Sequence, residues 1–137
     1  MPVNPALARL IEQVLLGSPL AARLGIALDT LEPERVVLRM PFHPDNVTVG
    51  SVVHGGAIAT LVDIAGAAAS ASGAGPDTRG GATSSLTLSY LAPADGADLA
   101  AEARVIQRGR SGTVSDIEVR DPGGRLVAKA LVTSRLF

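Results

Sequence analysis

The segment from residue 55 to residue 73 constrains the fold most, because it predicts a helix with very little side-chain bulk. Fourteen of its 19 residues are Gly, Ala, Ser or Thr. Its apolar residues recur at the helical spacing i, i+3, i+4 and i+7, at Ile58, Leu61, Val62 and Ala65. A helix this slim lets a curved sheet wrap closely around it, so we expect it to lie at the centre of the fold.

Asp63 is the one charged residue of this helix at neutral pH, and no other charge occurs between Gly55 and Pro76. It lies far around the helix from the stripe that starts at Ile58. Its neighbours on that side are all small, namely Gly56, Ala59, Gly66, Ala67 and Ser70. Another backbone, a partner helix or a ligand can therefore approach this face. A lone carboxylate there is either a solvated surface charge or a working group, and its uncharged neighbours favour the second.

The overall composition excludes several classes of function. The chain has 137 residues, enough for one domain with a buried core, and is 47% apolar and 18% charged, which argues against disorder. It has no cysteine, which excludes disulfides, thiolate metal sites and cysteine nucleophiles. The net charge is −1 and the basic residues do not cluster, so we expect no nucleic-acid partner.

Two further expectations concern location. The chain does not begin with a basic region followed by a long apolar run, so we expect no signal peptide and a cytoplasmic protein. The apolar helix from Gly55 is short, Gly-rich and interrupted by Asp63, so we expect no membrane span.

Hydrophobic periodicity predicts the elements. A helix is predicted over residues 5–16, and Ser18 is expected to cap a short turn that runs to Arg23. The central helix is predicted over 55–72. Period-two alternation predicts strands over 25–31, 35–42, 85–90, 97–108, 113–120 and 125–136. Because helices and strands do not alternate, the predicted fold class is α+β, with an antiparallel sheet wrapped around the central helix.

Three segments of the chain resemble a known protein family. The string Asn46…Gly50…Val53-His54-Gly55-Gly56-Ala57…Leu61-Val62-Asp63 is similar to the signature of hotdog-fold acyl-CoA thioesterases, in the phenylacetic-acid-degradation-type branch of the 4-hydroxybenzoyl-CoA thioesterase superfamily. Thr83…Leu88-Ser89-Tyr90-Leu91-Ala92-Pro93-Ala94 resembles the family's third strand, and Arg108-Gly109-Arg110 with Gly124–Ala128 resembles its last hairpin. The resemblance predicts a single hotdog thioesterase domain over residues 1–137, with its core over about 25–137.

The resemblance also implies roles for individual residues. In the family the acid on the central helix is the general base or the nucleophile, which implies that role for Asp63. The first glycine after the histidine, Gly55 here, donates its backbone N–H to the thioester oxygen. An upstream asparagine positions water or substrate, a Ser or Thr on the third strand assists, and the histidine supports the loop. The resemblance implies these three roles for Asn46, Thr83 and His54, respectively.

The expected partners follow from the same resemblance. It implies an acyl-CoA substrate and a homodimer, often a dimer of dimers, with two active sites at the dimer interface. No cofactor is expected. Gly56 would let the acyl group approach without a Cβ in the way. Arg108, Gly109 and Arg110 form a basic hairpin that is either merely solvated or attracts the phosphates of coenzyme A.

Chemical geometry predicts the dimer independently. A tetrahedral oxyanion needs a hydrogen-bond donor, and glycines that open a helix offer free N–H groups in the positive end of the helix dipole. His54 and Asp63 are nine residues apart, about 13.5 Å along a helix and on opposite sides of it. One carbonyl cannot reach both ends within a chain. An antiparallel pair of helices would bring Gly55 of one chain next to Asp63 of the other.

Simpler interpretations stand beside these roles. His54 can be a structural residue that bonds loop backbone, Gly55-Gly56 can serve tight helix packing, and Thr83 can be an ordinary β-branched strand residue. His43, the other histidine, is interpreted as a loop residue. The spacing of the two histidines and Asp63 matches no usual metal-ligand set, so we expect no metal.

Three functions compete at this stage. The first is hydrolysis of an acyl-CoA thioester, with Asp63 as general base or nucleophile. The second is a non-catalytic hotdog domain that binds acyl-CoA, which would not need the acid. The third is a hotdog dehydratase or hydratase, whose histidine-and-acid motif this chain lacks. The identity of the acyl group, aryl or aliphatic, stays open, as does the choice between dimer and tetramer.

Overall fold

The elements follow the predicted order closely. The structure is a computed structural model that describes residues 2–137. Three helical segments open the chain, two strands follow, one long helix comes next, and four strands end it. They are α1 (Pro5–Arg9), η1 (Leu10–Leu15), α2 (Pro19–Leu24), β1 (Ala27–Glu32), β2 (Arg35–Met40), α3 (Gly55–Ser72), β3 (Gly81–Tyr90), β4 (Leu99–Arg108), β5 (Gly112–Arg120) and β6 (Leu126–Leu136).

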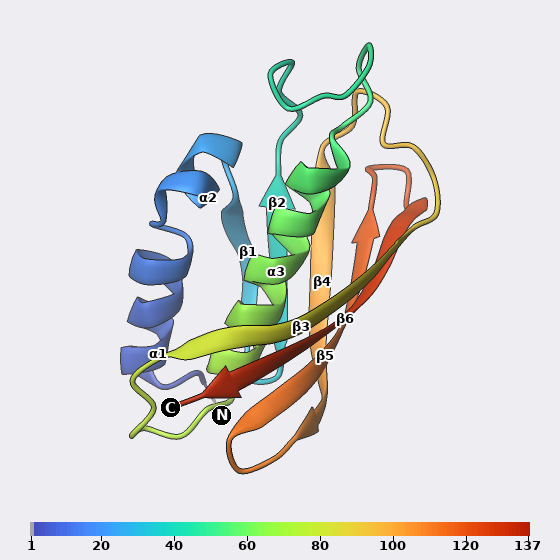
Figure 1. The fold of residues 1–137 in the computed structure, drawn as a ribbon. Coiled ribbons are helices and arrows are strands. Elements are labelled where there is room, and N and C mark those ends of the chain that lie inside the picture. The colour runs from blue at the N-terminus through green and yellow to red at the C-terminus, as the bar shows by residue number, and fades with distance from the viewer. Residues whose placement is uncertain (1) are drawn as a thin grey trace.

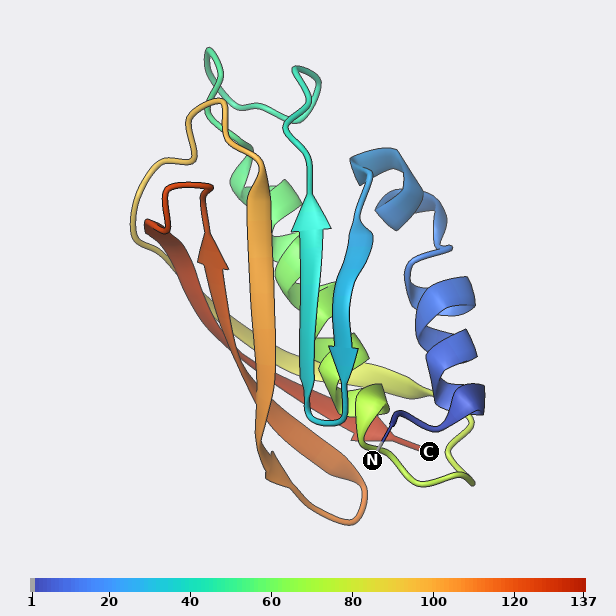
Figure 2. The same cartoon turned by 180° about the vertical axis from the view of Figure 1, so that it is seen from behind.

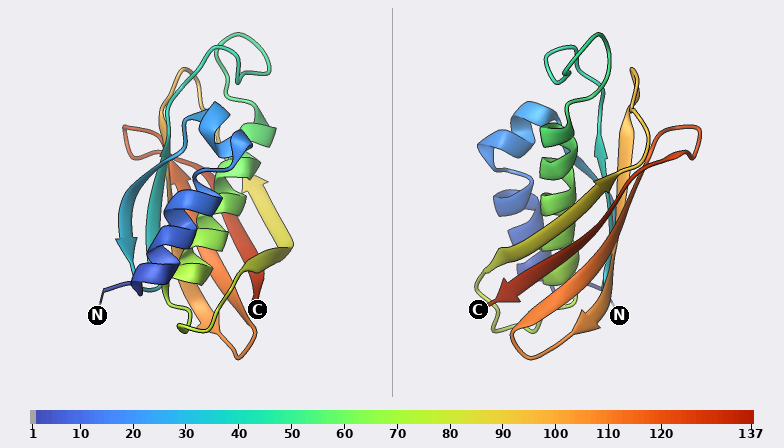
Figure 3. Two further views of the ribbon diagram at one scale, coloured as in Figure 1. Left: turned by 90° about the vertical axis from the view of Figure 1, so that its left-hand side faces the viewer. Right: turned by 45° about the vertical axis from the view of Figure 1, so that its right-hand side comes forward.

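One antiparallel sheet wraps around α3. Its strand order is β1-β2-β4-β5-β6-β3, and every neighbouring pair is antiparallel. The helix packs against β2, β3, β4, β5 and β6 (Figures 1 and 2). The sheet is strongly curved, so β3 and β6 cross the helix diagonally on one side (Figure 3, right). The predicted antiparallel sheet around a central helix is therefore confirmed.

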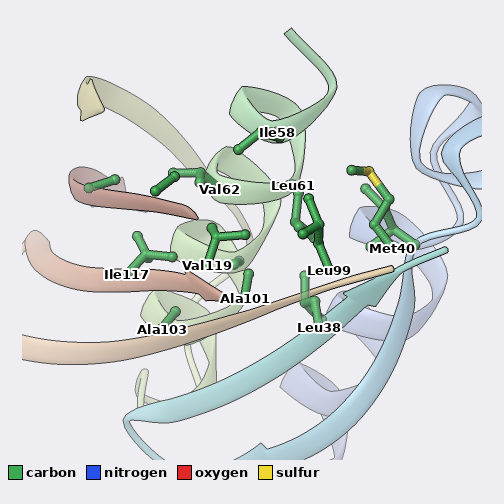
Figure 4. Close-up of a cluster of buried hydrophobic side chains, with 14 of the residues drawn as sticks. Leu38, Met40, Ile58, Leu61, Val62, Leu99, Ala101, Ala103, Ile117 and Val119 are labelled. Carbon is green, nitrogen blue, oxygen red and sulfur yellow. The ribbon is translucent and has the colours of Figure 1, made fainter. Parts of the chain in front are cut away.

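The core lies between the inner face of the sheet and one side of α3. Ile58, Leu61 and Val62 are at most 3% exposed, as the helical stripe in the sequence predicts. They meet the inward side chains of β2, β4 and β5, among them Leu38, Leu99, Ala101, Ile117 and Val119 (Figure 4). Buried and less buried residues alternate along β5 and along the first half of β4, the pattern of a sheet with one buried face, whereas β2 has three consecutive buried residues.

The small residues of α3 allow this close wrapping. A Cβ built on Gly66 would lie 2.7 Å from Cβ of Val132 on β6, closer than two carbon atoms can approach. The helix axis can therefore come nearer to β6 than any larger residue would allow. By length and composition α3 could also span a membrane, but 56% of it is buried inside the protein as the core helix. This burial accounts for its apolar character.

The N-terminal helices cover the side of α3 that the sheet leaves open (Figure 3, left). α1 and η1 form one continuous helical segment over residues 5–15, close to the predicted 5–16, but its second part has π-type turns. The predicted cap at Ser18 is wrong. Ser18 precedes α2, yet its side chain makes no cap bond, because its hydroxyl donates backwards to the Leu15 carbonyl at 2.9 Å.

The two edges of the sheet differ in character. β1 is six residues long, contains Asp29 and Glu32, and has a register shift between Leu28 and Thr30. Charges and bulges of this kind protect an edge from pairing with other chains. β3 is ten residues long and carries neither charge nor proline, and most of its side chains are exposed. Only β1 therefore has the features of a protected edge.

Candidate active site

The N-terminus of α3 offers one free backbone donor. His54 is the N-cap residue, and its Nδ1 accepts a hydrogen bond from the Gly56 N–H at 2.8 Å. Nδ1 must be unprotonated to accept this bond. Within residues 2–137, the Gly55 N–H has no hydrogen-bond acceptor. Of the two glycine donors at the helix start, Gly55 is the one left for a ligand.

Tyr90 braces the same glycine from the end of β3. Its hydroxyl donates to the Gly55 carbonyl oxygen at 2.6 Å. A Cβ on Gly55 would lie 3.1 Å from the ring and the hydroxyl of Tyr90, so the tight contact depends on glycine. The sequence pattern indicates Tyr90 only as a strand residue and does not reveal this contact. The one available signal was that the chain's single tyrosine lies within the family motif.

Asn46 lies beside the start of α3. The His54 N–H donates to the Asn46 carbonyl at 2.8 Å, and a bridge between Val47 and Val53 closes the loop. The side-chain nitrogen of Asn46 is buried and has no acceptor among the described residues. The predicted role of Asn46 in positioning water or substrate stays a prediction. His43 lies in the same loop and contacts Asp45, its near neighbour.

Asp63 and Thr83 meet across the gap between α3 and β3. The Thr83 hydroxyl donates to Oδ1 of Asp63 at 2.6 Å, a short bond of the charge-assisted kind. Oδ2 of Asp63 has no hydrogen-bond partner among the described residues. Twenty residues separate the two in sequence, and the curl of β3 around the helix brings them together. One carboxylate oxygen is thus fixed and the other is free to accept from a bound group.

Asp63 lines a cleft of about 420 Å³ that is mostly apolar. Its walls come from three parts of the fold: η1, the outer side of α3, and the paired ends of β3 and β6. The residues are Leu10, Val14, Leu15, Asp63, Ile64, Ala67, Ser70, Ala71, Arg79–Thr83 and Ser134–Leu136. A cleft of this size that is mostly apolar and has one carboxylate at its wall suits an apolar ligand with one polar reacting group.

Gly55 lines a different cleft. This second cleft, of about 390 Å³, lies between the loop before α3 and the end of β3, and Thr48, Val53, Tyr90 and Pro93 are among its walls. No residue lines both clefts. The free donor at Gly55 and the carboxylate of Asp63 therefore open on separate surfaces of one chain, as their spacing in sequence predicts.

Arg108 lies at the opposite end of α3 and is held there by hydrogen bonds through Nε and Nη2. Its guanidinium makes a two-pronged contact with Glu34, at 2.6 to 3.1 Å, and donates to the Ser70 carbonyl at 2.8 Å. Glu34 has a left-handed backbone with φ of 71°, and its N–H donates to the Ser72 hydroxyl. These bonds tie the β1–β2 turn to the C-terminus of the helix. The alternative that Arg108 is merely a solvated charge is wrong.

Gly109 and Arg110 line a third cleft, beyond the end of α3. Its volume is about 330 Å³, and it also includes the segment from Gly73 to Thr78 and Phe137. Arg110 is exposed, and the described part of the chain contains no carboxylate paired with it. The structure therefore separates the predicted substrate-binding set, with Gly56 at one end of α3 and Arg108–Arg110 at the other. Their role toward substrate stays a prediction.

A metal centre finds no support in the described residues. Residues 2–137 contain no group of three or more His, Asp or Glu side chains close enough to share an ion.

A long central helix wrapped by a six-stranded antiparallel sheet, with a carboxylate on the helix, defines a hotdog-fold protein. The chain belongs to the Thioesterase superfamily, whose profile matches residues 50–128. This match includes all of α3 with Asp63, the strands β3, β4 and β5, and the start of β6. It confirms the fold and the family resemblance inferred from the sequence.

Relatives support the assignment. A candidate esterase of Halobacterium salinarum is 36% identical over 119 residues, which cover 84% of this chain and 78% of that protein. The crystal structure of a thioesterase family protein from Silicibacter pomeroyi has a TM-score of 0.88 at 28% identity, covering 96% of this chain and 98% of that one.

Two further solved structures share the fold at lower identity. The E. coli PaaI protein, from the phenylacetic acid degradation operon, has a TM-score of 0.84 at 23% identity and covers 96% of this chain and 93% of its own. A Streptococcus mutans protein bound to acetyl-CoA has a TM-score of 0.74 at 24% identity, and the match covers 82% of this chain and 88% of that one.

Proposed function

We propose that this protein hydrolyses acyl-CoA thioesters to a free acid and coenzyme A. In the proposed reaction, Asp63 acts as general base toward water or as nucleophile, and the Gly55 N–H of the partner subunit stabilises the oxyanion. Membership of the Thioesterase superfamily supports thioester hydrolysis in general. The observation that carries the residue assignment is the bond from Thr83 to one oxygen of Asp63 at an apolar cleft.

The hydrogen bonding of Asp63 supports its proposed role as general base or nucleophile. A general base must lie within hydrogen-bond reach of the proton that it takes and must be held in one orientation. The Thr83 hydroxyl holds Oδ1 at 2.6 Å, which leaves Oδ2 for the water or for direct attack on the thioester carbon. A charge that only faced solvent would need no such partner. The thioester carbonyl would then lie at the mouth of the Asp63 cleft, with its acyl group inside.

The oxyanion donor is proposed to come from a second chain. The Gly55 N–H is free of protein acceptors and lies in the positive end of the helix dipole, which favours a negative oxygen. Gly55 and Asp63 line separate clefts of one chain, and about 12 Å of helix separates them. An antiparallel arrangement of two α3 helices about a two-fold axis would join the cleft of each chain to the donor of the other.

The edge strand β3 supports the same dimer. It presents a row of unpaired backbone groups over ten residues, without the charges or prolines that usually block such an edge. Thr83 near its start and Tyr90 at its end contact Asp63 and Gly55 respectively. If β3 pairs with β3 of a second copy in antiparallel fashion, the start of one strand lies beside the end of the other. Asp63 and Thr83 of each chain would then lie beside Gly55 and Tyr90 of the other, so the dimer would contain two complete sites.

Coenzyme A is the proposed carrier of the acyl group. Acetyl-CoA is bound by the Streptococcus mutans protein that shares the fold. On this chain, Arg110 is an exposed cation suited to a phosphate, whereas Arg108 is already bound to Glu34. We therefore assign phosphate binding to Arg110 ahead of Arg108.

The test is a panel of acyl-CoA thioesters, aryl and aliphatic, with release of the free thiol followed by a colorimetric reagent. We expect turnover by the wild type and a loss of kcat of about 100-fold or more in Asp63→Asn, which keeps the shape and removes the base. Asp29→Asn, an exposed carboxylate on β1, is the matched control and should keep full activity. Tight binding of acyl-CoA with no turnover by the wild type would instead favour a binding domain.

A further inference from the structure

One wall of the Asp63 cleft is built by a segment outside the part of the chain that matches the family profile. Leu10, Val14 and Leu15 of η1 line the cleft, whereas the profile begins at residue 50. The remaining walls come from α3, from the residues that lead into β3, and from the ends of β3 and β6; of these, Ser134–Leu136 also lie beyond the profile, which ends at residue 128. The η1 wall is thus the wall that the N-terminal helical segment contributes, apart from the central helix and the sheet.

The π-type turns of η1 present these three residues together. In a π-helix the N–H of a residue bonds the carbonyl five residues back, as the Leu16 N–H does with Ile11 at 3.0 Å. Residues four and five apart then lie over one another, so Leu10, Val14 and Leu15 share a face. In an α-helix, where residues three and four apart share a face, Leu15 would turn away from Leu10. Such turns occur frequently at functional sites.

The segment is anchored on one side and open on the other. Ile11 is fully buried in the core cluster, which fixes the position of η1 against α3. Val14 is 57% exposed although it is apolar, and it borders the cleft that holds Asp63. None of the residues that line this cleft is aromatic. The η1 side of the cleft is thus lined by branched aliphatic side chains, of which Val14 is largely exposed.

We infer that η1 is the specificity wall of the site, and that Val14 limits the length of an aliphatic acyl group. This inference rests on the proposed thioesterase function and deepens it. With the thioester carbonyl at Asp63, the acyl chain would run along Ile64 and Ala67 of α3 and end against Val14 and Leu10. A larger side chain at residue 14 shortens the space, and a smaller one lengthens it.

The experiment compares Val14→Phe and Val14→Ala with the wild type on straight-chain acyl-CoAs from acetyl to dodecanoyl. Relative to acetyl-CoA, Val14→Phe should lose about tenfold or more in kcat/KM on the longest chain that the wild type accepts. Val14→Ala should shift the preferred length upward. Leu20→Phe is the matched control, because Leu20 is 53% exposed on α2 and lines none of the three clefts. It should leave the length profile unchanged.

A binding series separates this inference from the proposed function. S-alkyl-CoA thioethers of the same lengths cannot be hydrolysed, and their affinities for wild type and variants can be measured by calorimetry. If the wild type hydrolyses no acyl-CoA but Val14→Phe still weakens only the long thioethers, the proposed function fails and the specificity wall stands. If the wild type is active and both Val14 variants keep its length profile, the wall is refuted. Native mass spectrometry checks that neither variant changes the assembly; a profile shift that accompanies a changed mass would also refute the wall.

Discussion

Thr83 acts on the proposed chemistry through a single oxygen of Asp63. Thr83→Val removes the 2.6 Å hydrogen bond while keeping the branched shape, so the carboxylate loses its fixed orientation. We expect kcat to fall about tenfold to 100-fold with little change in KM, since the loss concerns positioning and not binding. Thr83→Ser keeps the hydroxyl and should restore most of the turnover. Steady-state kinetics of both variants checks this.

A contrary result would be informative in either direction. Wild-type turnover in Thr83→Val together with a loss in Thr83→Ser would mean that the methyl group, and not the hydroxyl, supports the site. Thr87→Val controls for a general effect on the exposed strand, because Thr87 is also on β3 and bonds no carboxylate.

Among individual residues, the sequence predicted roles but not contacts. Asp63 was predicted as a working group from its isolation on a small-residue face, and an assisting role for Thr83 was implied by the family resemblance, but the hydrogen bond between them was not predicted. The contact of Arg108 with Glu34 joins residues that are 74 apart in the sequence. It also depends on the left-handed backbone of Glu34, which no local sequence pattern predicts. The bond between Tyr90 and Gly55 likewise depends on how far the sheet curls, and curl is not encoded in strand periodicity.

The C-terminus of α3 depends on the guanidinium of Arg108. Lysine keeps the charge of Arg108 but cannot bond both oxygens of Glu34 and the Ser70 carbonyl together. We expect Arg108→Lys to lower the free energy of unfolding by about 1–2 kcal/mol, a modest value because the pair is partly exposed. Its KM for acyl-CoA should stay near that of the wild type.

Arg110→Ala is the counterpart variant. It should leave the free energy of unfolding nearly unchanged and raise the KM for acyl-CoA, because the Arg110 guanidinium is exposed and we assign it to the coenzyme phosphates. Urea denaturation and kinetics on the same preparations distinguish the two arginines. A stable Arg108→Lys with a raised KM would reverse our assignment.

Helix α3 needs glycine at its contact with β6. Alanine is the better helix former by about 1 kcal/mol, yet Gly66→Ala would push a Cβ to 2.7 Å from Val132. Overpacking of this kind costs about 1–3 kcal/mol, so we expect Gly66→Ala to lower the stability measured by urea denaturation.

The pair can be tested by a double-mutant cycle. Val132→Ala alone should destabilise the protein by leaving a cavity, but it also removes Cγ1, which lies 2.7 Å from the Cβ position of Gly66, so together with Gly66→Ala it should lose less than the sum of the two single changes. Gly75→Ala is the control, because no atom lies within 4 Å of its Cβ position. Additive losses for Gly66→Ala and Val132→Ala would mean that the contact does not limit the approach of helix and sheet.

Element types were predictable where periodicity is strong. The central helix and the strands β4, β5 and β6 were located within about two residues, because burial on one face imposes a period on the sequence. The π-type turns of η1 were not predictable. The apolar positions Leu7, Leu10, Ile11, Val14 and Leu15 fit an α-helix equally well, and the difference lies in which carbonyl each N–H bonds.

The proposed site between two chains predicts complementation between two inactive variants. Asp63→Asn removes the base, and Gly55→Val blocks the approach to the oxyanion donor, with its side chain also pressing on Tyr90. In a mixed dimer one site receives both defects and the other receives neither. Random pairing makes about half of the dimers mixed, so about a quarter of wild-type activity should return on equal mixing. Activity is measured after subunit exchange, which native mass spectrometry confirms.

A second mixture serves as the control. Asp63 and Thr83 belong to the same cleft of one chain, so mixing Asp63→Asn with Thr83→Val creates no intact site. The activity of that mixture should stay at the mean of the activities of the two separate variants. If exchange occurs and neither mixture regains activity, the donor and the base serve the same chain, and the antiparallel arrangement of the two helices is wrong.

The uncharged edge of β3 also bears on how the protein behaves when it is diluted. An exposed edge without charge, proline or cover is a template for aggregation, and β3 offers ten residues of it. If a second copy normally covers this edge, separated chains are the aggregation-prone species. Lowering the concentration, or weakening the contact by mutation, would then promote precipitation where most proteins become more soluble, and the colloidal stability of each chain would depend on its partner.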